Sequence, residues 1–342
     1  MRGMNDTKNM QLKPIFIREQ IIKSVRDFFT DLGFHEVIIP VLNTALPLEQ
    51  NIYPFKTTWD NLKAKKEFYL TTSPEAYLKK MISLGMGNCF GIGHSFRNLE
   101  DSGSLHNPEF LMLEWYREDA DYKKIMKEVR ELIIYIHNEI QEYKLLCHSR
   151  ESGNPFRLKS EWIPGQARDD NRLWSVLSLV DLFQKYAKLN LAEIIDDQRL
   201  IKAAKGKEYE IKNKTWEQIF NQIFLNEIEA HLPKDPFFLI DYPTRISTLC
   251  AKRKDKPYLA ERFELYINGI EIGNGNTENT DTEDVVRSMK REEKYRKKMG
   301  ILSPPIDTDF IKALDYMKNK KYAGIGLGVD RLAMILTGSK NI

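Results

Sequence analysis

The sequence predicts an α+β fold, in which a mainly antiparallel β-sheet is flanked by helices. Strand-like segments follow one another as hairpins, most clearly around Asn268-Gly269, a dipeptide typical of tight turns between antiparallel strands. Amphipathic helical segments are grouped around these strands and do not alternate with them one by one. Both observations favour α+β over a doubly wound parallel sheet.

Composition narrows the classes of protein to consider. The 342 residues include 52 Lys and Arg against 49 Asp and Glu, with 42% apolar and 30% charged residues. This balance is typical of a globular chain, and a net charge of +3 does not predict bulk nucleic-acid binding. We find no apolar run long enough for a membrane span and no signal peptide in residues 1–12. Three widely spaced cysteines fit no CxxC metal pattern, so we expect a reducing cytoplasm.

Helices are predicted where apolar residues recur every three or four positions. The first ends before Gly33, a residue typical of helix C-termini. The second begins with Ser73 as N-cap and Pro74 as the first helical residue. The predicted helices cover residues 17–32, 74–85, 123–142, 174–189, 216–231, 282–299, 309–318 and 330–336.

Strands are predicted from short runs rich in β-branched and aromatic residues between turn residues. They cover residues 36–41, 68–72, 89–96, 109–116, 237–242, 262–267, 270–274 and 323–329. A change in composition then marks residues 148–171, which are polar, contain two prolines and two glycines, and lack a period. We interpret them as a surface insertion that resembles translated palindromic repeats of bacterial genomes and carries no chemistry; a substrate lid is the alternative.

Polar residues gather in three segments beyond what packing requires. In the first, Arg97 and His106 lie at the two ends of a polar loop, and Phe110 follows. The two basic side chains suit an anionic ligand, and Phe110 offers a flat face for a planar base. An incidental polar hairpin explains each residue alone, but it does not explain the cluster.

The second segment places Glu271 and Asn274 on a predicted strand and Glu278 after a turn. Two carboxylates beside a nucleotide would hold Mg²⁺, which prefers oxygen ligands. A turn with solvated acids is the alternative.

The third segment has glycines at positions 324, 326 and 328, followed by Arg331. It matches neither the dinucleotide-binding pattern nor a P-loop. The glycines would let a ligand lie flat on a strand, and Arg331 would begin a helix that faces phosphate.

Together these segments resemble the class II aminoacyl-tRNA synthetases. FRN…HNPEFLMLEWY is similar to motif 2 and GIGLGVDRLAMIL to motif 3, while the helix and strand ending at Pro40 resemble motif 1, the usual dimer interface. HNPEF, EIGNG and GLGVDR are similar to the lysyl-tRNA synthetase branch. The resemblance implies a single class II catalytic domain over residues 1–342, with 148–171 as an insertion.

One absence favours a subtype of this family. Lysyl-tRNA synthetases carry an N-terminal OB-fold domain that reads the anticodon, and too few residues precede the first predicted helix for such a domain. The chain therefore resembles the stand-alone elongation factor P–(R)-β-lysine ligases, to which SPE at 73–75, LEWY at 113–116 and ERFELY at 261–266 are similar. The resemblance implies activation of (R)-β-lysine with ATP and Mg²⁺ and transfer to a lysine of elongation factor P. It also implies a cytoplasmic homodimer that needs neither tRNA nor a membrane.

The resemblance also implies roles for individual residues. As catalytic residues, Arg97 would contact the α-phosphate and the substrate carboxylate, and Arg331 would cover the adenine and reach the γ-phosphate. Further ATP contacts are expected from Asn98, His106, Asn107, Phe110, Glu271, Ile272 and Gly328. Amino-acid contacts are expected from Ser73, Pro74, Glu75, Glu114, Tyr116, Asn274 and Glu278. Magnesium is expected at Glu271 and Glu278.

Two departures from the family pattern keep alternatives open. The family has FRNE where this chain has FRN-Leu99-Glu100 and a loop one residue longer, so either Glu100 takes the acidic role or that ATP contact is lost. Gly326 stands where alanine is expected in the elongation-factor branch, so the choice between lysine and (R)-β-lysine stays open. The alternative functions are charging of tRNA or another acceptor, and non-catalytic sensing of ATP or lysyl-adenylate.

Overall fold

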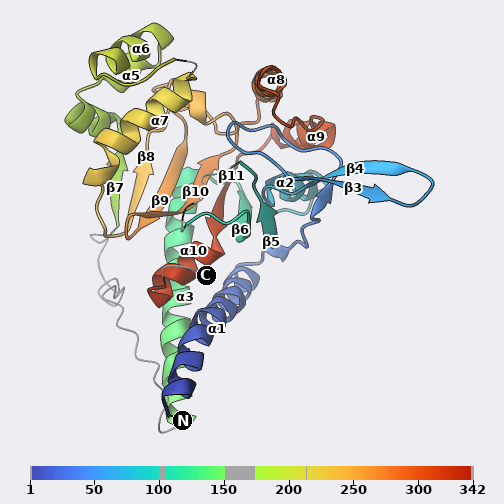
Figure 1. The fold of residues 1–342 in the computed structure, drawn as a ribbon. Coiled ribbons are helices and arrows are strands. Elements are labelled where there is room, and N and C mark those ends of the chain that lie inside the picture. Colours follow the sequence, from blue (N-terminus) through green and yellow to red (C-terminus); the bar gives the residue numbers. More distant parts are fainter. Residues whose placement is uncertain (1, 100–102, 104, 151–173, 213, 340–342) are drawn as a thin grey trace.

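The computed structural model describes residues 2–99, 103, 105–150, 174–212 and 214–339 (Figure 1). Its main sheet has eight strands in the order β1-β5-β6-β11-β10-β9-β8-β7. Neighbours are antiparallel except at the two edges, where β1 pairs with β5 and β7 with β8 in parallel. The strands are β1 (His35–Glu36), β5 (Cys89–Phe96), β6 (Glu109–Glu118), β7 (Ser175–Ser178), β8 (Phe237–Ile240), β9 (Arg262–Ile267), β10 (Ile270–Thr277) and β11 (Tyr322–Gly328). The predicted α+β class with a mainly antiparallel sheet is confirmed.

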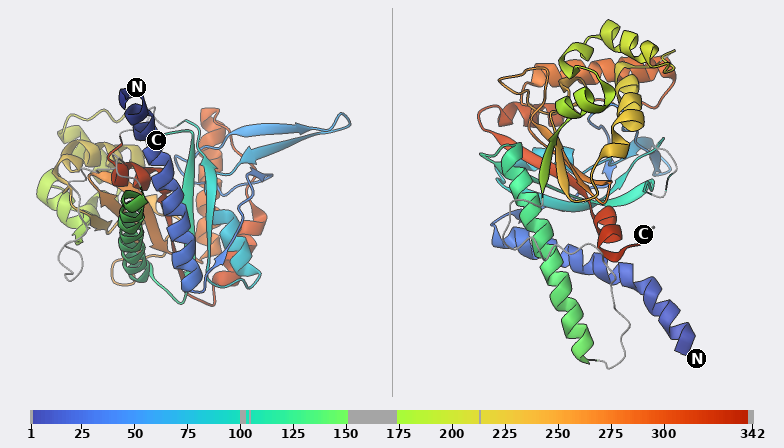
Figure 2. Two further views of the ribbon diagram at one scale, coloured as in Figure 1. Left: turned by 90° about the horizontal axis from the view of Figure 1, so that it is seen from below. Right: turned by 90° about the vertical axis from the view of Figure 1, so that its left-hand side faces the viewer.

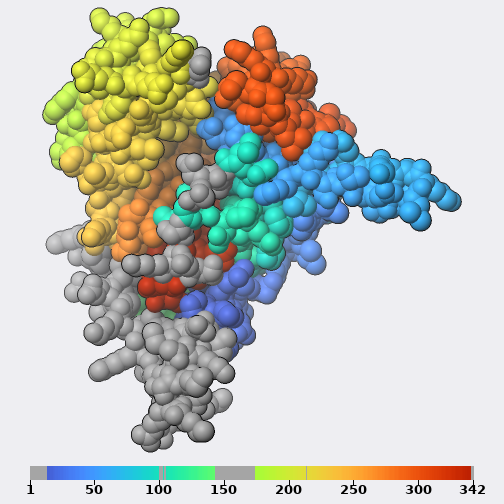
Figure 3. Space-filling model, viewed as in Figure 1, coloured from blue at the N-terminus to red at the C-terminus, as the bar shows by residue number. Residues whose placement is uncertain are grey.

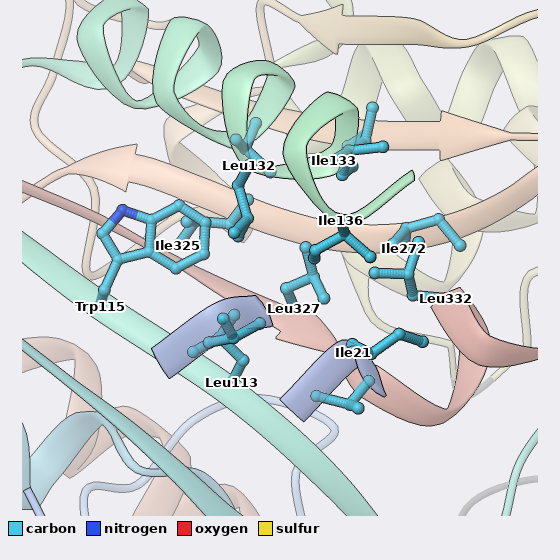
Figure 4. Close-up of a cluster of buried hydrophobic side chains, with 14 of the residues drawn as sticks. Ile21, Leu113, Trp115, Leu132, Ile133, Ile136, Ile272, Ile325, Leu327 and Leu332 are labelled. Carbon is cyan, nitrogen blue, oxygen red and sulfur yellow. The ribbon is translucent and has the colours of Figure 1, made fainter. Parts of the chain in front are cut away.

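Three helices cover one face of this sheet, namely α1 (Arg2–Asp31), α3 (Tyr122–Arg150) and α10 (Val329–Thr337). Figure 2 shows α1 and α3 crossing beneath the strands. Alternate residues of the central strands point toward these helices, so that Leu113 and Leu327 are buried against Ile21 and Ile136 (Figure 4). The other residues of β6 and β11 therefore face the opposite side, where polar groups are available.

The opposite side carries two groups of helices. One group is α2 (Glu75–Ser83), α8 (Thr282–Met299) and α9 (Thr308–Met317). The other packs on β7 and β8 and has its own core, in which Phe183 stacks on Phe220 at 4.7 Å between ring centroids. It comprises α4 (Leu179–Leu182), a π-helical turn Phe183–Ala187, α5 (Leu191–Ile194), α6 (Asp197–Gly206), α7 (Trp216–Glu227) and 3₁₀ turns at Glu229–His231 and Thr244–Ile246.

A second, three-stranded sheet has the order β2 (Leu42–Asn43), β4 (Lys65–Leu70), β3 (Lys56–Asp60). Figure 1 shows β3 and β4 projecting from the body of the molecule. Every residue of β3 is exposed, so the strand lacks the apolar alternation by which strands are recognised, and it was absent from the predicted set.

Three sequence predictions need correction. The strand expected over 36–41 pairs only at His35–Glu36, and the Ile38 side chain is 90% exposed. The helix expected over 174–189 begins as strand β7, which pairs in parallel with β8 at the sheet edge, and helix α4 starts only at Leu179. Helix α2 has Pro74 at its N-cap, and the hydroxyl of Ser73 accepts only a 3.4 Å hydrogen bond from the Glu75 amide.

Other predictions lie partly beyond the described residues. Of the predicted insertion, residues 148–150 continue helix α3 and residues 151–171 lie outside the part of the chain that the structure describes. Among the described helices none is both long and apolar enough to cross a membrane. Cys89 and Cys250 are buried free thiols.

Candidate active site

The floor of the candidate site is formed by β11, which lies between β6 and β10. Gly326 pairs with Glu114 on one side and with Asn274 on the other. Because Ile325 and Leu327 are buried on the helical face, the alternate glycines face the opposite side. They leave a strip without side chains between two rows of polar residues. The cavity above this strip has a volume of about 560 Å³.

The glycines of the floor differ in how much space surrounds them. A Cβ at Gly324 would lie 2.5 Å from the Tyr116 ring, so no other residue fits there without movement. A Cβ at Gly326 would lie 3.5 Å from Met112 Sδ and 3.9 Å from Glu114 Oε2, which are ordinary contacts. The structure therefore has room for a methyl group at Gly326.

One end of the cavity is basic and aromatic. Arg97 follows β5, and its guanidinium carbon lies 5.2 Å from the centroid of the Phe110 ring. Arg331, in the first turn of α10, donates from Nη1 to the Glu271 carbonyl oxygen at 2.9 Å. His106 and the two arginines line the same cavity. Two guanidinium groups and an aromatic face suit a polyphosphate attached to a planar base.

The other end is acidic. Glu114 Oε1 accepts a 2.6 Å hydrogen bond from the Tyr116 hydroxyl. Glu114 Oε2 is buried and has no hydrogen-bond partner among the described residues. Burial, and next the charge of Glu75, raise the pKa of Glu114 well above its usual value. A carboxylate in this position would gain from a ligand that brings an ammonium group.

Lys79 is a buried residue of this acidic end that the sequence analysis missed. Its ammonium lies 2.5 Å from Glu278 Oε2 and also pairs with Glu75, and its side chain is fully buried. Burial lowers the pKa of Lys79, but the two carboxylates outweigh this effect and the pKa lies above its usual value. Burial raises the pKa of Glu278 to about 7, against the opposing charge of Lys79. The spacing of Glu75 and Lys79, four residues apart on one helix, was the signal that could have identified this pair.

The two carboxylates predicted to bind magnesium have different neighbours. Glu278 is held by Lys79 and Asn276, while Glu271 lies in the field of Glu264. Burial, and next the charge of Glu264, raise the pKa of Glu271 to about 7. The described residues include no cluster of three or more His, Cys, Asp or Glu side chains arranged for a metal ion. A shared magnesium site at Glu271 and Glu278 stays a prediction. Glu264 already has partners, since its Oε1 pairs with Arg262 at 2.7 Å and its Oε2 accepts a 2.9 Å hydrogen bond from the Tyr266 hydroxyl.

The loop around residue 49 adds a carboxylate that no sequence pattern indicated. Glu49 lines the cavity, and its carbonyl oxygen accepts a 2.6 Å hydrogen bond from the buried guanidinium of Arg296. Burial and the charge of Glu75 raise the pKa of Glu49 to about 7, while Arg97 opposes this shift. Arg296 on α8 thus holds a loop whose acid faces the site.

Most residues predicted for the site do line this cavity. Those that line it are Ser73, Glu75, Arg97, His106, Asn107, Phe110, Glu114, Tyr116, Glu271, Ile272, Asn274, Gly328 and Arg331. Three predicted residues are outside its lining. Glu278 lies behind it with Lys79, Pro74 caps α2, and the Asn98 side chain accepts a hydrogen bond from the Leu99 amide at 2.9 Å.

Comparison with known proteins identifies the architecture. The family model described as tRNA synthetases class II (D, K and N) matches residues 2–342. The chain belongs to this family. As a class II synthetase it places its three polar segments around one cavity, as the resemblance of those segments implied.

Individual relatives of this class II synthetase are ligases. The elongation factor P–(R)-β-lysine ligase of Hamiltonella defensa is 29% identical over 99% of this chain and 97% of that protein. The ligase of the same name from Yersinia enterocolitica is 31% identical over 95% and 91%. A lysine–tRNA ligase from Vesicomyosocius okutanii is 32% identical over 99% of this chain and 64% of that protein. The chain is therefore an enzyme of the ligase type.

Proposed function

We propose that this class II synthetase activates (R)-β-lysine or lysine with ATP and transfers the aminoacyl group to a lysine side chain of elongation factor P. The observation that carries the activation step is a single cavity with Arg97 and Arg331 at one end and Glu75 and Glu114 at the other. The acceptor is proposed from similarity over at least 91% of two ligases that are named for elongation factor P.

The basic end would bind ATP. Phe110 and Arg331 would enclose the adenine, and Arg97 would contact both the substrate carboxylate and the α-phosphate. Bringing these two anionic groups together requires a cation between them, and negative charge develops on the α-phosphoryl oxygens as the carboxylate attacks. A planar guanidinium, held by the carbonyl of Thr72 at 3.3 Å, meets both demands.

The acidic end would bind the ammonium groups of the amino acid. Glu75, Glu114 and Glu278 carry three negative charges and Lys79 one positive charge, which leaves a net charge of −2 when all four are ionised. (R)-β-lysine and lysine each bring two ammonium groups. Glu114 Oε2 is buried without a hydrogen-bond donor among the described residues, so an ammonium group of the substrate would satisfy it. Ser73 and Asn274 line the same cavity.

The residues present also fit a magnesium ion. Glu271 lines the cavity, and burial raises the pKa of its carboxyl to about 7, so a cation bound there would stabilise the ionised form. Glu271, together with Glu278 as the family resemblance implies, would hold the ion, which when bound neutralises phosphate charge. His106 and Asn107 line the ATP end of the cavity, where the terminal phosphates would lie.

In the second step an acceptor amine would attack the carbonyl carbon of the adenylate. A C–N bond forms, the bond between the carbonyl carbon and the phosphate oxygen breaks, and AMP leaves with that electron pair. The attacking neutral amine passes one proton to solvent and keeps the other as the amide N–H. Arg97, already placed at the α-phosphate, would stabilise the leaving phosphate. We also propose that the enzyme acts in the cytoplasm as a homodimer, as the motif 1 resemblance implies.

The first test is the intact mass of the organism's elongation factor P after incubation with this enzyme, ATP and Mg²⁺. Parallel reactions contain lysine and (R)-β-lysine, and we expect an adduct of one aminoacyl group. A charged tRNA without modified elongation factor P would instead favour the tRNA-charging alternative. Absence of amino-acid-dependent ATP–pyrophosphate exchange would favour the sensor.

A further inference from the structure

A second cavity of about 430 Å³ adjoins the active-site cavity. It lies between α7, α8 and the loop that contains Gln50 and Asn51. Figure 3 shows the surface hollowed between the yellow helix α7 and the orange helix α8. The two cavities meet along shared lining residues, which are Gln50, Glu217, Ser247, Thr248 and Cys250. The second cavity is therefore a candidate route into the first.

Three other sides of the active-site cavity are taken up by described residues or by the proposed nucleotide. The floor is the glycine strand of the sheet, and the basic end would hold AMP during transfer. The acidic end is closed by α2, whose Lys79 is fully buried between Glu75 and Glu278. The side shared with the second cavity is therefore the approach that we consider for the acceptor.

Glu217 stands at this junction. Its Oε1 accepts a 2.8 Å hydrogen bond from Asn51 Nδ2, a neutral donor. The other carboxylates of the second cavity have cationic partners, since Asp284 pairs with Lys252 at 2.9 Å and Glu292 with Arg296 at 2.7 Å. Among the ion pairs of the described residues, none includes Glu217. Burial raises the pKa of Glu217, which Arg262 opposes, so an arriving cation would stabilise its charged form.

We propose that the second cavity admits the acceptor lysine, and that Glu217 binds its ammonium before it reaches the activated carboxyl group. The inference rests on the proposed function, because it assumes a primary amine on a protein as acceptor. The cavity would take the flanking polypeptide of that lysine, and its polar lining includes Asn279 and Tyr295. Acceptor binding is thereby separated from ATP binding, which uses the opposite end of the site.

The experiment compares two acceptors for the same adenylate. Hydroxylamine is small enough to reach the adenylate from any opening, and the hydroxamate it forms measures activation. Elongation factor P, followed by intact mass, measures transfer through the proposed route. For Glu217→Gln we expect the ratio of protein transfer to hydroxamate formation to fall at least about tenfold. Glu227→Gln, at the far end of α7 and paired with Lys207 at 2.8 Å, is the matched control.

A second variant tests the cavity itself. Ser288 on α8 lines the second cavity but not the first, so Ser288→Phe would fill it. Lys290→Phe places the same bulk on an exposed position of α8 as its control. We expect Ser288→Phe to lower the same ratio. An unchanged ratio in both Glu217→Gln and Ser288→Phe would overturn the inference. A wild-type enzyme that forms hydroxamate but leaves elongation factor P unmodified would overturn the proposed acceptor and the route together.

Discussion

Lys79 Nζ lies 2.5 Å from Glu278 Oε2, and neither side chain is more than 1% exposed. This ion pair connects α2 to the end of β10 directly behind the substrate pocket, and Glu75 joins it from the first turn of α2. An ammonium built into the protein thus holds two of the carboxylates that would bind an ammonium-bearing substrate.

Removing this lysine should destabilise the fold. In Lys79→Met, two buried carboxylates lose their partner, and we expect a loss of about 3–5 kcal/mol in the free energy of unfolding. Chemical denaturation measures this. The control is Lys297→Met, which breaks a pair with Glu293 at the same four-residue spacing but with the lysine side chain 67% exposed, and should cost less than about 1 kcal/mol. Equal losses in the two variants would contradict a central role for burial.

The size of residue 326 should influence which amino acid is activated. Gly326→Ala places a methyl group 3.9 Å from Glu114 Oε2 without a clash. We expect the variant to fold. We expect the ratio of kcat/KM for (R)-β-lysine to kcat/KM for lysine to rise by a factor that corresponds to about 1–3 kcal/mol. ATP–pyrophosphate exchange with each amino acid measures this. Gly324→Ala, whose methyl group would lie 2.5 Å from the Tyr116 ring, should instead lose stability. An unchanged preference in Gly326→Ala would show that selectivity arises elsewhere.

Adenylate formation should depend on the basic end. Arg331→Ala removes the guanidinium bound to the Glu271 carbonyl, and Glu271→Ala removes the carboxylate proposed for magnesium. We expect each to lower the pyrophosphate exchange rate by roughly 100-fold or more, because Arg331 would stabilise phosphate charge directly and Glu271 would do so by holding the magnesium ion. Arg26→Ala, which breaks an exposed 3.0 Å pair with Glu36, is the control and should retain exchange. Near wild-type exchange in Arg331→Ala would disprove the assignment of this end to ATP.

Amino-acid binding should strengthen as pH rises. Burial raises the pKa of Glu278 and of Glu49 to about 7, so these carboxyls are largely protonated at about pH 5.5 and ionised at about pH 8. The ionised forms attract ammonium groups. In the free enzyme the free energy of unfolding should fall as pH rises from about 4.5 through 7, because the folded state then holds protons that the unfolded state has released. Calorimetric titration with lysine should therefore give a lower Kd at the higher pH. A Kd independent of pH would exclude both groups from amino-acid binding.

Much of the fold follows from local patterns. Helices α3, α7, α8 and α9 were predictable because their apolar residues repeat with the helical period and meet a core. Strand β3 was not predictable, because a fully exposed projecting strand has no buried face to leave a pattern. The short length of β1 could not be predicted either. Ile38 is a residue type that favours strands, but its side chain is exposed beyond the end of the paired segment.

The class II synthetase fold and the gathering of Arg97, Phe110, Glu114 and Arg331 at one site could be predicted from the sequence, because their signals lie in short contiguous segments. The partner of each charge became known from the three-dimensional structure. It buried Lys79 between Glu75 and Glu278, and it paired Glu264 with Arg262. The physical reason is that a partner depends on burial and on register across strands, including the irregular pairing between Glu271 and Gly273. Apart from near neighbours in the chain such as Glu75 and Lys79 or Arg262 and Glu264, these distances arise between residues remote in the chain, and spacing along the chain does not encode them.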